Sequence, residues 1–211
     1  NLEGETVMAL SSFSGLKASI ADFLNRSDLT AVIPDFITLT EADLSRNLRV
    51  REMSVRTRAP VSTQYVKLPA DFQSLRNIDL LTDPVSPLQY RTPRKLDQFR
   101  REDKSGQPVF YTIMQNNLEF SPVPEKEYTV EILYHQTIPT LSDSTTTNWL
   151  LDKHPDAYLY GSLMQSAPYL KSDERIPVWA GRYQQILDQI RSGDDDARYS
   201  GSTPVITFTP F

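Results

Sequence analysis

Two groups of polar side chains in this 211-residue chain have a spacing that could support catalysis. His154 lies between Asp152 and Asp156, so a histidine and a carboxylate could share a proton as an acid–base pair. The run Asp194–Asp196 offers carboxylate oxygens of the kind that divalent cations prefer. Both groups also have a simpler interpretation. Carboxylates stabilise helix starts, and three consecutive aspartates without the spacing of a calcium loop form a solvated acidic link.

The composition gives catalysis little further support. The chain has no cysteine, two histidines and seven glycines, which excludes disulfides, thiol nucleophiles and cysteine-based zinc sites. Ser162 follows Gly161, but no second glycine completes a nucleophile elbow. The sequence therefore predicts a protein that is not an enzyme and that has no catalytic residues, no cofactor and no metal site.

Arginine-rich segments are the first candidates for partner binding. One contains Arg46, Arg49, Arg51, Arg56 and Arg58, and the other contains Arg91, Arg94, Lys95, Arg100, Arg101 and Lys104. Guanidinium groups bind carboxylates and phosphates alike. Three interpretations stay open: an exposed basic rim, ion pairing with another protein, and contact with a DNA backbone. From these segments we predict partner contacts at Arg49, Arg51, Arg56, Arg58, Arg100 and Arg101.

The C-terminal stretch is the second candidate. Val205, Ile206 and Phe208 are apolar and strand-prone, yet no strand lies next to them in the sequence. Their backbone groups could pair with a neighbouring subunit or fold back onto the chain's own sheet, and both options stay open. We add these three residues to the predicted partner-binding set.

Apolar periodicity predicts helices at both ends of the chain. Stripes at helical spacing indicate helices over residues 12–26 and 33–49, the second with Pro34 in its first turn. Another helix begins at Pro155. The last helix is capped by Asp173 and is predicted to end at Gly193, because glycine commonly terminates helices.

The centre of the chain has the alternation of strands. Predicted strands are Tyr65–Leu68, Leu75–Leu81 paired with Val85–Tyr90, a hairpin of Val109–Met114 and Leu118–Phe120, and Tyr128–Tyr134. Asparagine at the hairpin turn tolerates the positive φ that a tight turn needs. A short helix over 93–103 interrupts these strands, and residues 137–147 form a loop.

These elements predict an α+β fold. Residues 8–50 and 148–192 form a helical bundle, residues 51–147 form a β-rich region, and residues 193–211 form a C-terminal arm. We set residues 1–7 aside as a possible non-native leader. No apolar run is long enough for a transmembrane helix, so no membrane contact is predicted.

Charge is divided unevenly along the chain, whose total is −5. Residues 1–104 carry a net charge of +1, and residues 105–211 carry −6. One interpretation is that surfaces of opposite sign meet between copies of the protein. The alternative is chance variation among solvated faces.

A series of short motifs resembles a known family. The motifs are Leu24–Leu29, Ile33–Ile37, Leu48–Met53, Leu68–Phe72, Pro108–Ile113, Asn148–Leu151 and His154–Asp156. In order and spacing, over residues 8–192, they resemble the head-to-tail adaptor proteins (connector, or tail tubular A-like) of tailed, especially short-tailed, bacteriophages.

The resemblance implies a structural protein of the virion neck, present in the host cytoplasm before assembly. It implies a dodecameric ring that binds the portal protein on one side and the tail nozzle on the other. Genome DNA would pass the channel without sequence-specific binding. Two alternatives stay open: another tail or baseplate structural protein, and a metal-dependent hydrolase that uses His154 and Asp194–Asp196.

Overall fold

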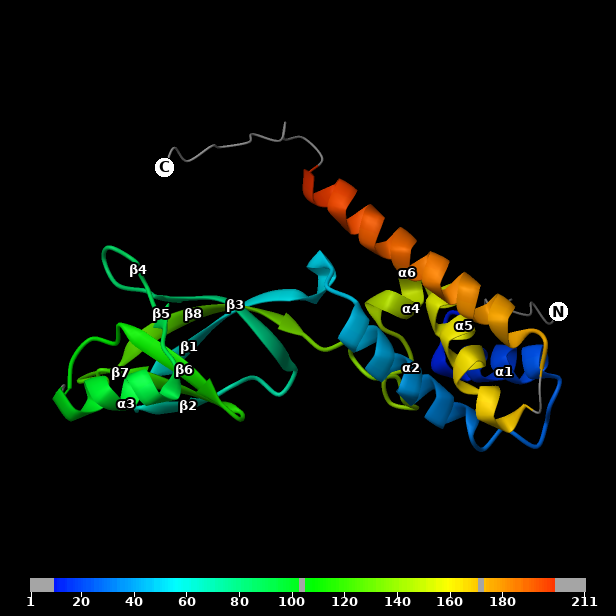
Figure 1. Ribbon diagram of the computed structural model, residues 1–211, viewed down its shortest axis with the longest axis horizontal. Helices are drawn as coiled ribbons and strands as arrows, with labels where there is room; N and C mark the ends of the chain where they lie inside the picture. Colours follow the sequence, from blue (N-terminus) through cyan, green and yellow to red (C-terminus); the bar gives the residue numbers. More distant parts are fainter. Residues whose placement is uncertain (1–9, 103–104, 171–172, 200–211) are drawn as a thin grey trace, which may run out of the picture. The chain divides into compact units, whose positions relative to one another are not determined.

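A computed structural model describes residues 10–102, 105–170 and 173–199, with the backbone alone for residues 100–102 and 199 (Figure 1). The chain folds as two compact units. Asn1–Glu52 and Ile138–Phe211 make up the helical unit, and Met53–Thr137 make up the β unit. Helices near both ends of the chain flank a strand-rich centre, so the predicted α+β class is confirmed.

The helical unit contains α1 (Phe13–Leu24), α2 (Ile33–Asn47), α4 (Trp149–Lys153), α5 (Pro155–Gln165) and α6 (Ile176–Tyr199), with 3-10 turns η1 (Arg51–Met53) and η2 (Ala167–Tyr169). Local sequence sets several of the ends. The Ser12 side chain accepts a hydrogen bond from the Gly15 N–H at the start of α1, and Asn25 ends that helix in the left-handed conformation. Pro34 lies in the first turn of α2, as predicted.

The middle of the helical unit is α5, which packs against α1, α2 and α6. Residues on nearly every side of α5 are buried, among them Tyr158 and Leu163. A helix that is buried all round must have other helices around it. Gly161 allows α5 to pack closely against α2 and α6. A Cβ at this position would overlap Thr40 Cγ2 of α2 and would lie 3.0 Å from Tyr183 Cε2 of α6.

The prediction that the last helix ends at Gly193 is wrong, because α6 continues to Tyr199. The cause is tertiary and electrostatic. Asp194 is buried, accepts a hydrogen bond from the Arg51 N–H at 2.9 Å, and pairs with Arg198 one turn later at 2.7 Å. These contacts outweigh the low helix propensity of one glycine, and they place Asp194–Asp196 within a helix instead of in a flexible link.

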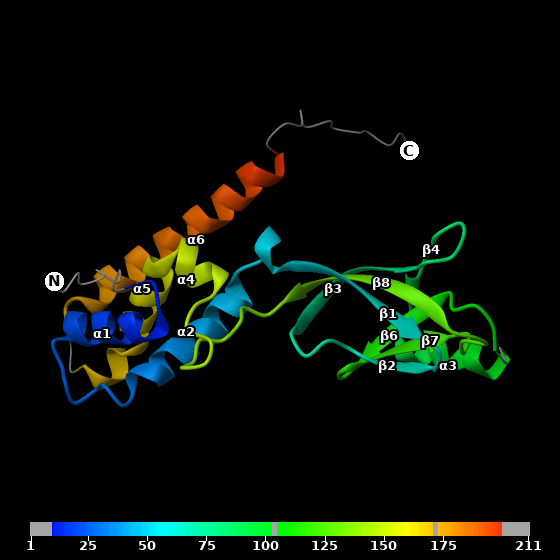
Figure 2. The same ribbon diagram turned by 180° about the vertical axis from the view of Figure 1, so that it is seen from behind.

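The β unit contains two four-stranded sheets, whose strands can be followed from both sides in Figures 1 and 2. The first has the order β1 (Ser54–Val61), β8 (Tyr128–Gln136), β3 (Phe72–Leu80) and β4 (Ser86–Pro87), all antiparallel. The second has the order β2 (Tyr65–Lys67), β7 (Asn117–Ser121), β6 (Phe110–Met114) and β5 (Gln89–Tyr90), with β5 parallel to β6.

Residues 85–90 differ from the prediction of a single strand paired with 75–81. Only β4 pairs with β3, while β5 joins the other sheet. Leu88 lies at the crossover: it is buried, its N–H donates to Ile78 O, and the next N–H, that of Gln89, donates to Val109 O. Burying this one apolar residue between the sheets divides the strand.

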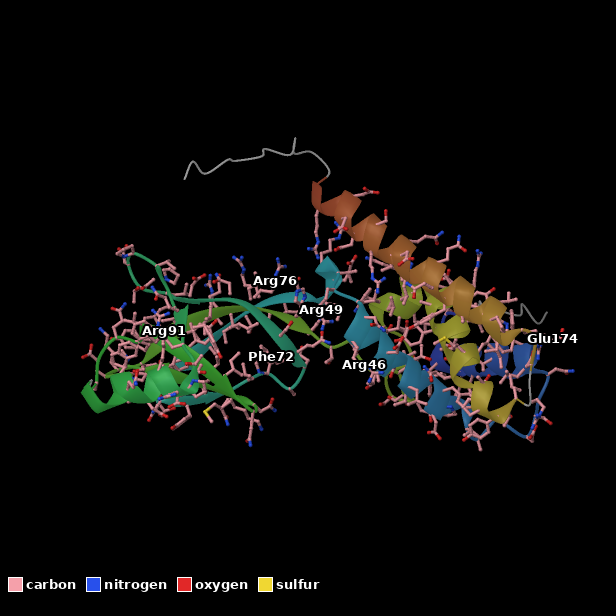
Figure 3. All side chains as sticks on the ribbon, in the orientation of Figure 1. Arg46, Arg49, Phe72, Arg76, Arg91 and Glu174 are labelled. Atoms are coloured by element: carbon pink, nitrogen blue, oxygen red, sulfur yellow. The ribbon has the colours of Figure 1, made fainter. Side chains whose placement is uncertain are left out.

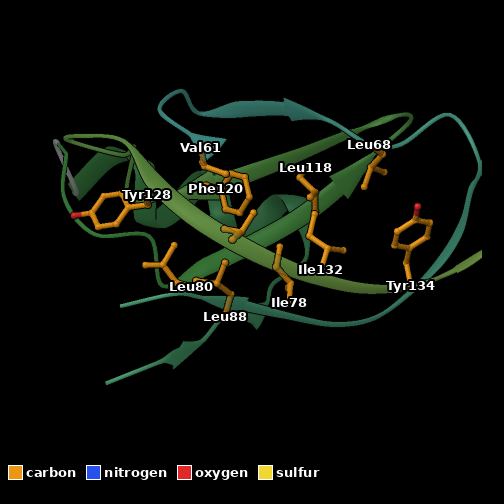
Figure 4. Packing of buried hydrophobic residues seen from close by; sticks show 11 residues of the cluster. Val61, Leu68, Ile78, Leu80, Leu88, Leu118, Phe120, Tyr128, Ile132 and Tyr134 are labelled. Carbon is orange, nitrogen blue, oxygen red and sulfur yellow. The ribbon is translucent and has the colours of Figure 1, made fainter. Parts of the chain in front are cut away.

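The inner faces of the two sheets form the core of the β unit (Figure 4). Tyr128, Val130, Ile132 and Tyr134 all point into it from β8, which confirms the alternation predicted for this strand. The helix α3 (Pro93–Glu102) covers the outer face of the second sheet, where Phe99 stacks on Phe110 at 4.9 Å between ring centroids. The β6–β7 hairpin is also confirmed, but its positive φ of 54° falls on Gln115 and not on asparagine.

A buried polar network fastens the loop after the β unit to the helices. Glu41 is 4% exposed, and its Oε1 accepts hydrogen bonds from the Leu141 N–H (2.7 Å) and the Tyr158 hydroxyl (3.3 Å). Asn148 donates to Pro139 O and to the Tyr158 hydroxyl oxygen. Burial raises the pKa of the Glu41 carboxyl above its ordinary value, and the hydrogen bonds from Leu141 and Tyr158 offset only part of this effect.

Gly161→Ala should destabilise the helical unit by about 1–3 kcal/mol, because the added methyl group forces α5 away from α2. The matched control is Gly181→Ala in α6, where a Cβ meets nothing within 4 Å. That change should stabilise by about 0.5–1 kcal/mol through helix propensity. Thermal or urea unfolding of both variants measures the difference. An equal effect of the two substitutions would show that the close approach at Gly161 is not a constraint.

Glu41→Gln should raise stability at neutral pH, because glutamine keeps the acceptor oxygen without a buried charge. The raised pKa means that the folded state holds the Glu41 proton more tightly than the unfolded state. The native chain therefore loses stability as pH rises from the ordinary glutamate value through the raised folded value. The advantage of the glutamine variant should shrink as pH is lowered through that window.

Glu41→Ala is the companion variant. It leaves the Leu141 N–H unpaired and should cost about 1–3 kcal/mol at low pH, where Glu41 of the native chain is protonated. This cost should shrink as pH rises, because only the native chain then holds a buried charge. Urea unfolding from pH 4 to 8 compares the three chains. A glutamine variant less stable than the native chain at pH 7 would show that the Glu41 charge is stabilising.

Candidate partner-binding surfaces

The outer face of the sheet β1-β8-β3-β4 carries a group of mostly charged side chains, which we call the arginine face. Its members come from three neighbouring strands: Arg56, Arg58, Glu131, Leu133, Arg76, Asn77 and Asp79. Strand alternation produces it, because Val55 and Ala59 of β1 turn inward while Arg56 and Arg58 turn outward. Each outward member is exposed or half-buried.

Two arginines on this face share one carboxylate. Arg56 Nη1 lies 3.3 Å from Glu131 Oε1, and Arg58 Nε donates to Glu131 Oε2 at 2.9 Å. The Arg56 and Arg58 side chains are 66% and 68% exposed, so these pairs add little to stability. Because one carboxylate faces two guanidinium groups, the cluster keeps a net positive charge and unused N–H donors.

The structure separates the first arginine segment of the sequence into two roles. Arg56 and Arg58 belong to the β unit, whereas Arg49 and Arg51 belong to the helical unit. Arg49 Nη1 donates to Ser45 O (2.8 Å) and Leu48 O (2.6 Å), so its side chain satisfies carbonyls at the end of α2. Figure 3 labels Arg49 in the helical unit, and Arg76 and Arg91 in the β unit.

The end of α6 holds the stretch of chain that leads out of α2, an arrangement we call the connector clamp. Arg191 donates to Asn47 O and Arg198 donates to Arg49 O, both at 3.2 Å, while Asp194 accepts from the Arg51 N–H. From the α4 side, Lys153 Nζ contacts Glu52 Oε1 at 2.8 Å. Residues 47–52 are therefore fixed to the helical unit from two sides.

A hollow of about 250 Å³ adjoins the connector clamp and contains the residues that suggested catalysis. His154, Lys153 and Asp194 line it, together with Trp149. The carboxylates that flank His154 have structural partners: Asp152 accepts from the Thr147 hydroxyl, and Asp156 accepts from the Ala157 N–H at the start of α5. These contacts agree with the simpler interpretation of the sequence, in which the carboxylates near His154 stabilise a helix start.

The possible metal ligands do not converge. Asp194 is engaged in the connector clamp, while Asp195 and Asp196 are exposed. Within residues 10–102, 105–170 and 173–199, no three histidine, aspartate or glutamate side chains lie close enough together to hold a metal ion. Ser162 is fully buried, with the Thr40 hydroxyl 3.5 Å away.

The second basic segment is placed in part. The Arg91 guanidinium lies over the Phe110 ring at 4.8 Å and donates to Gln89 Oε1, whereas Arg94 and Lys95 are exposed on α3. The side chains of Arg100 and Arg101 lie outside the described residues. So do Val205, Ile206 and Phe208 of the predicted arm, and residues 1–7.

Partner contacts for Arg49, Arg51, Arg56, Arg58, Arg100 and Arg101 stay predictions. The connector clamp was missed from the sequence. Its one visible signal is the i,i+4 spacing of Asp194 and Arg198, which favours a helix that continues past Gly193. Among the helices described, none combines the length and the apolar character needed to cross a membrane.

The family model described as SU10 adaptor protein matches residues 11–207, which is nearly the whole chain. No curated protein matches the chain. The match confirms the resemblance drawn from the sequence motifs and identifies a structural protein of the phage virion. The chain therefore belongs to the SU10 adaptor protein family.

Proposed function

We propose that this chain forms a ring between the capsid portal and the tail, as a head-to-tail adaptor. The observation that carries the proposal is the family match over residues 11–207. The division into two units supports it physically. An adaptor must bind two different neighbours, and two units with separate cores can each present a surface of their own.

In this proposal the portal protein and the tail nozzle are the partners, and the ring is the dodecamer that the resemblance implies. The charges support a ring built from one repeated contact between unlike surfaces: the helical unit carries a net charge of −6 and the β unit +1. Such a heterologous contact closes into a ring when its rotation permits. The chain would reside in the virion neck, and in the host cytoplasm before assembly.

Genome DNA would pass the ring without sequence-specific binding, because a surface with a net charge of −5 repels phosphates at a distance. No catalytic step is part of the proposal. The hydrolase alternative depended on His154 and Asp194–Asp196, and the engagement of Asp194 in the connector clamp removes one of its ligands. Another tail or baseplate position stays the alternative within the virion.

The ring is tested by measuring the stoichiometry of the protein in assembled particles. Imaging of the neck and native mass measurement of a portal–adaptor complex should show a closed ring with one repeated contact between unlike surfaces. The free chain can be monomeric, since binding to a portal brings the copies together. A stable two-fold dimer, both in solution and in the particle, would contradict the proposal.

The predicted arm is tested by two truncations. A chain ending at Tyr199 keeps α6 and the connector clamp, so it should melt like the full chain yet fail to join particles. A chain ending at Ser192 loses Asp194 and Arg198 and leaves the Arg51 N–H unpaired. Its free energy of unfolding should be lower than that of the Tyr199 chain by about 1–3 kcal/mol. Thermal unfolding and particle incorporation are the two readouts. Normal incorporation of the Tyr199 chain would remove the arm from the assembly contact.

A further inference from the structure

We propose that the arginine face of one copy docks against the acidic C-terminal end of α6 on a second copy. This inference rests on the proposed ring and names the contact that closes it. The arginine face lies on the β unit and keeps a net positive charge. The acidic end lies on the helical unit. Each copy thus carries both surfaces, the arginine face on its β unit and the acidic end of α6 on its helical unit.

The centre of the arginine face has the composition of a docking surface. Leu133 lies in the middle strand β8, with Arg56 opposite on β1 and Asn77 opposite on β3. Two residues away along β8, on the same face, Glu131 lies opposite Arg58 and Asp79. A half-buried leucine with arginines around it matches the pattern of protein interfaces, where apolar centres and arginine are enriched.

The edge of the sheet argues against an added strand as the occupant. Among the described strands β1 pairs only with β8, so its other edge is open. Pro60 lies in that edge and lacks an N–H, and the exposed Arg56 and Arg58 stand beside it. Proline and charged side chains are the usual devices that prevent strand addition. The surface is therefore suited to side-chain recognition.

Two carboxylates at the acidic end of α6 have no cationic partner among the described residues. Asp195 and Asp196 are exposed, and in the described part of the chain neither forms an ion pair, because Arg198 is engaged by Asp194. Both lie in the last turns of α6, where the helix dipole disfavours negative charge. Guanidinium groups from another molecule would satisfy these carboxylates, and the arginine face has N–H donors to offer.

A second copy fits this face better than DNA does. Glu131 and Asp79 lie among the arginines, so the face lacks the uninterrupted basic stripe that a phosphate backbone follows. The helical unit carries the negative charge that complements the face. Since the two surfaces lie on different units, the contact is heterologous and repeats from copy to copy.

The absence of native cysteine permits a direct test. The full chain carrying Arg58→Cys and Asp195→Cys is assembled into particles and exposed to a mild oxidant. Non-reducing gels should show a ladder of three or more linked copies. The control combines Arg58→Cys with Arg182→Cys, which is exposed on α6 about 20 Å from position 195 along the helix, and should give no ladder.

Charge exchange provides the second readout. The double change Arg56→Glu and Arg58→Glu should reduce particle incorporation about tenfold or more, as should Asp195→Lys with Asp196→Lys. Combining all four changes should restore most of the incorporation, which a simple folding defect would not allow. Circular dichroism and thermal melting verify that each chain is folded.

The outcomes separate this inference from the proposed ring. A ring in the neck without a ladder and without rescue overturns the docking contact and leaves the ring intact. A ladder that stops at two copies overturns the heterologous contact. Normal incorporation of the arginine variants with loss of bound DNA would assign the face to nucleic acid and overturn the inference. Absence of any ring overturns the proposed function itself.

Discussion

The burial of α5 is the constraint on which the helical unit depends. Residues before position 53 and residues after position 137 must fold together although 85 residues of the β unit separate them. They do so because α5 has no side exposed to solvent and is covered by helices from both segments. Gly161 allows the contact to be close, and Glu41 with Tyr158 satisfies the polar groups that this closeness buries. The β unit is consequently an insertion between the halves of a helical core.

Much of this architecture could be predicted from the sequence because it rests on local periodicity. The alternation of Tyr128–Tyr134 fixes which side of β8 faces the core, and the stripes of α1, α2 and α6 fix their buried sides. What could not be predicted depends on contacts distant in sequence. Gly193 is locally a helix terminator, and α6 continues past it because Asp194 contacts Arg51, 143 positions earlier, as well as Arg198. Residues 85–90 look like one strand until Leu88 is buried between two sheets.

The candidate site shows the same division. Counting arginines predicted a single basic segment from Arg46 to Arg58, because sequence proximity was the only information available. The chain crosses from one unit to the other within that segment, so Arg49 caps a helix while Arg56 and Arg58 cover a sheet. The pairing of two arginines with Glu131 requires the β1–β8 register, which joins residues 73 positions apart. The family resemblance could therefore be inferred from the order of the sequence motifs, whereas the arginine face and the connector clamp could be identified only from the fold.

The connector clamp also has a mechanical consequence. A tensile load applied to the chain beyond Tyr199 enters the fold through α6, whose 24 residues extend over about 36 Å. The first bonds to bear it are those of Asp194 and Arg198, which hold the same stretch of chain that leads to the β unit. Behind them the load is shared in shear by the apolar side of the helix, including Tyr183 and Ile190. Tension from the C-terminal side is thus divided between the stretch that leads into β1 and the helical core.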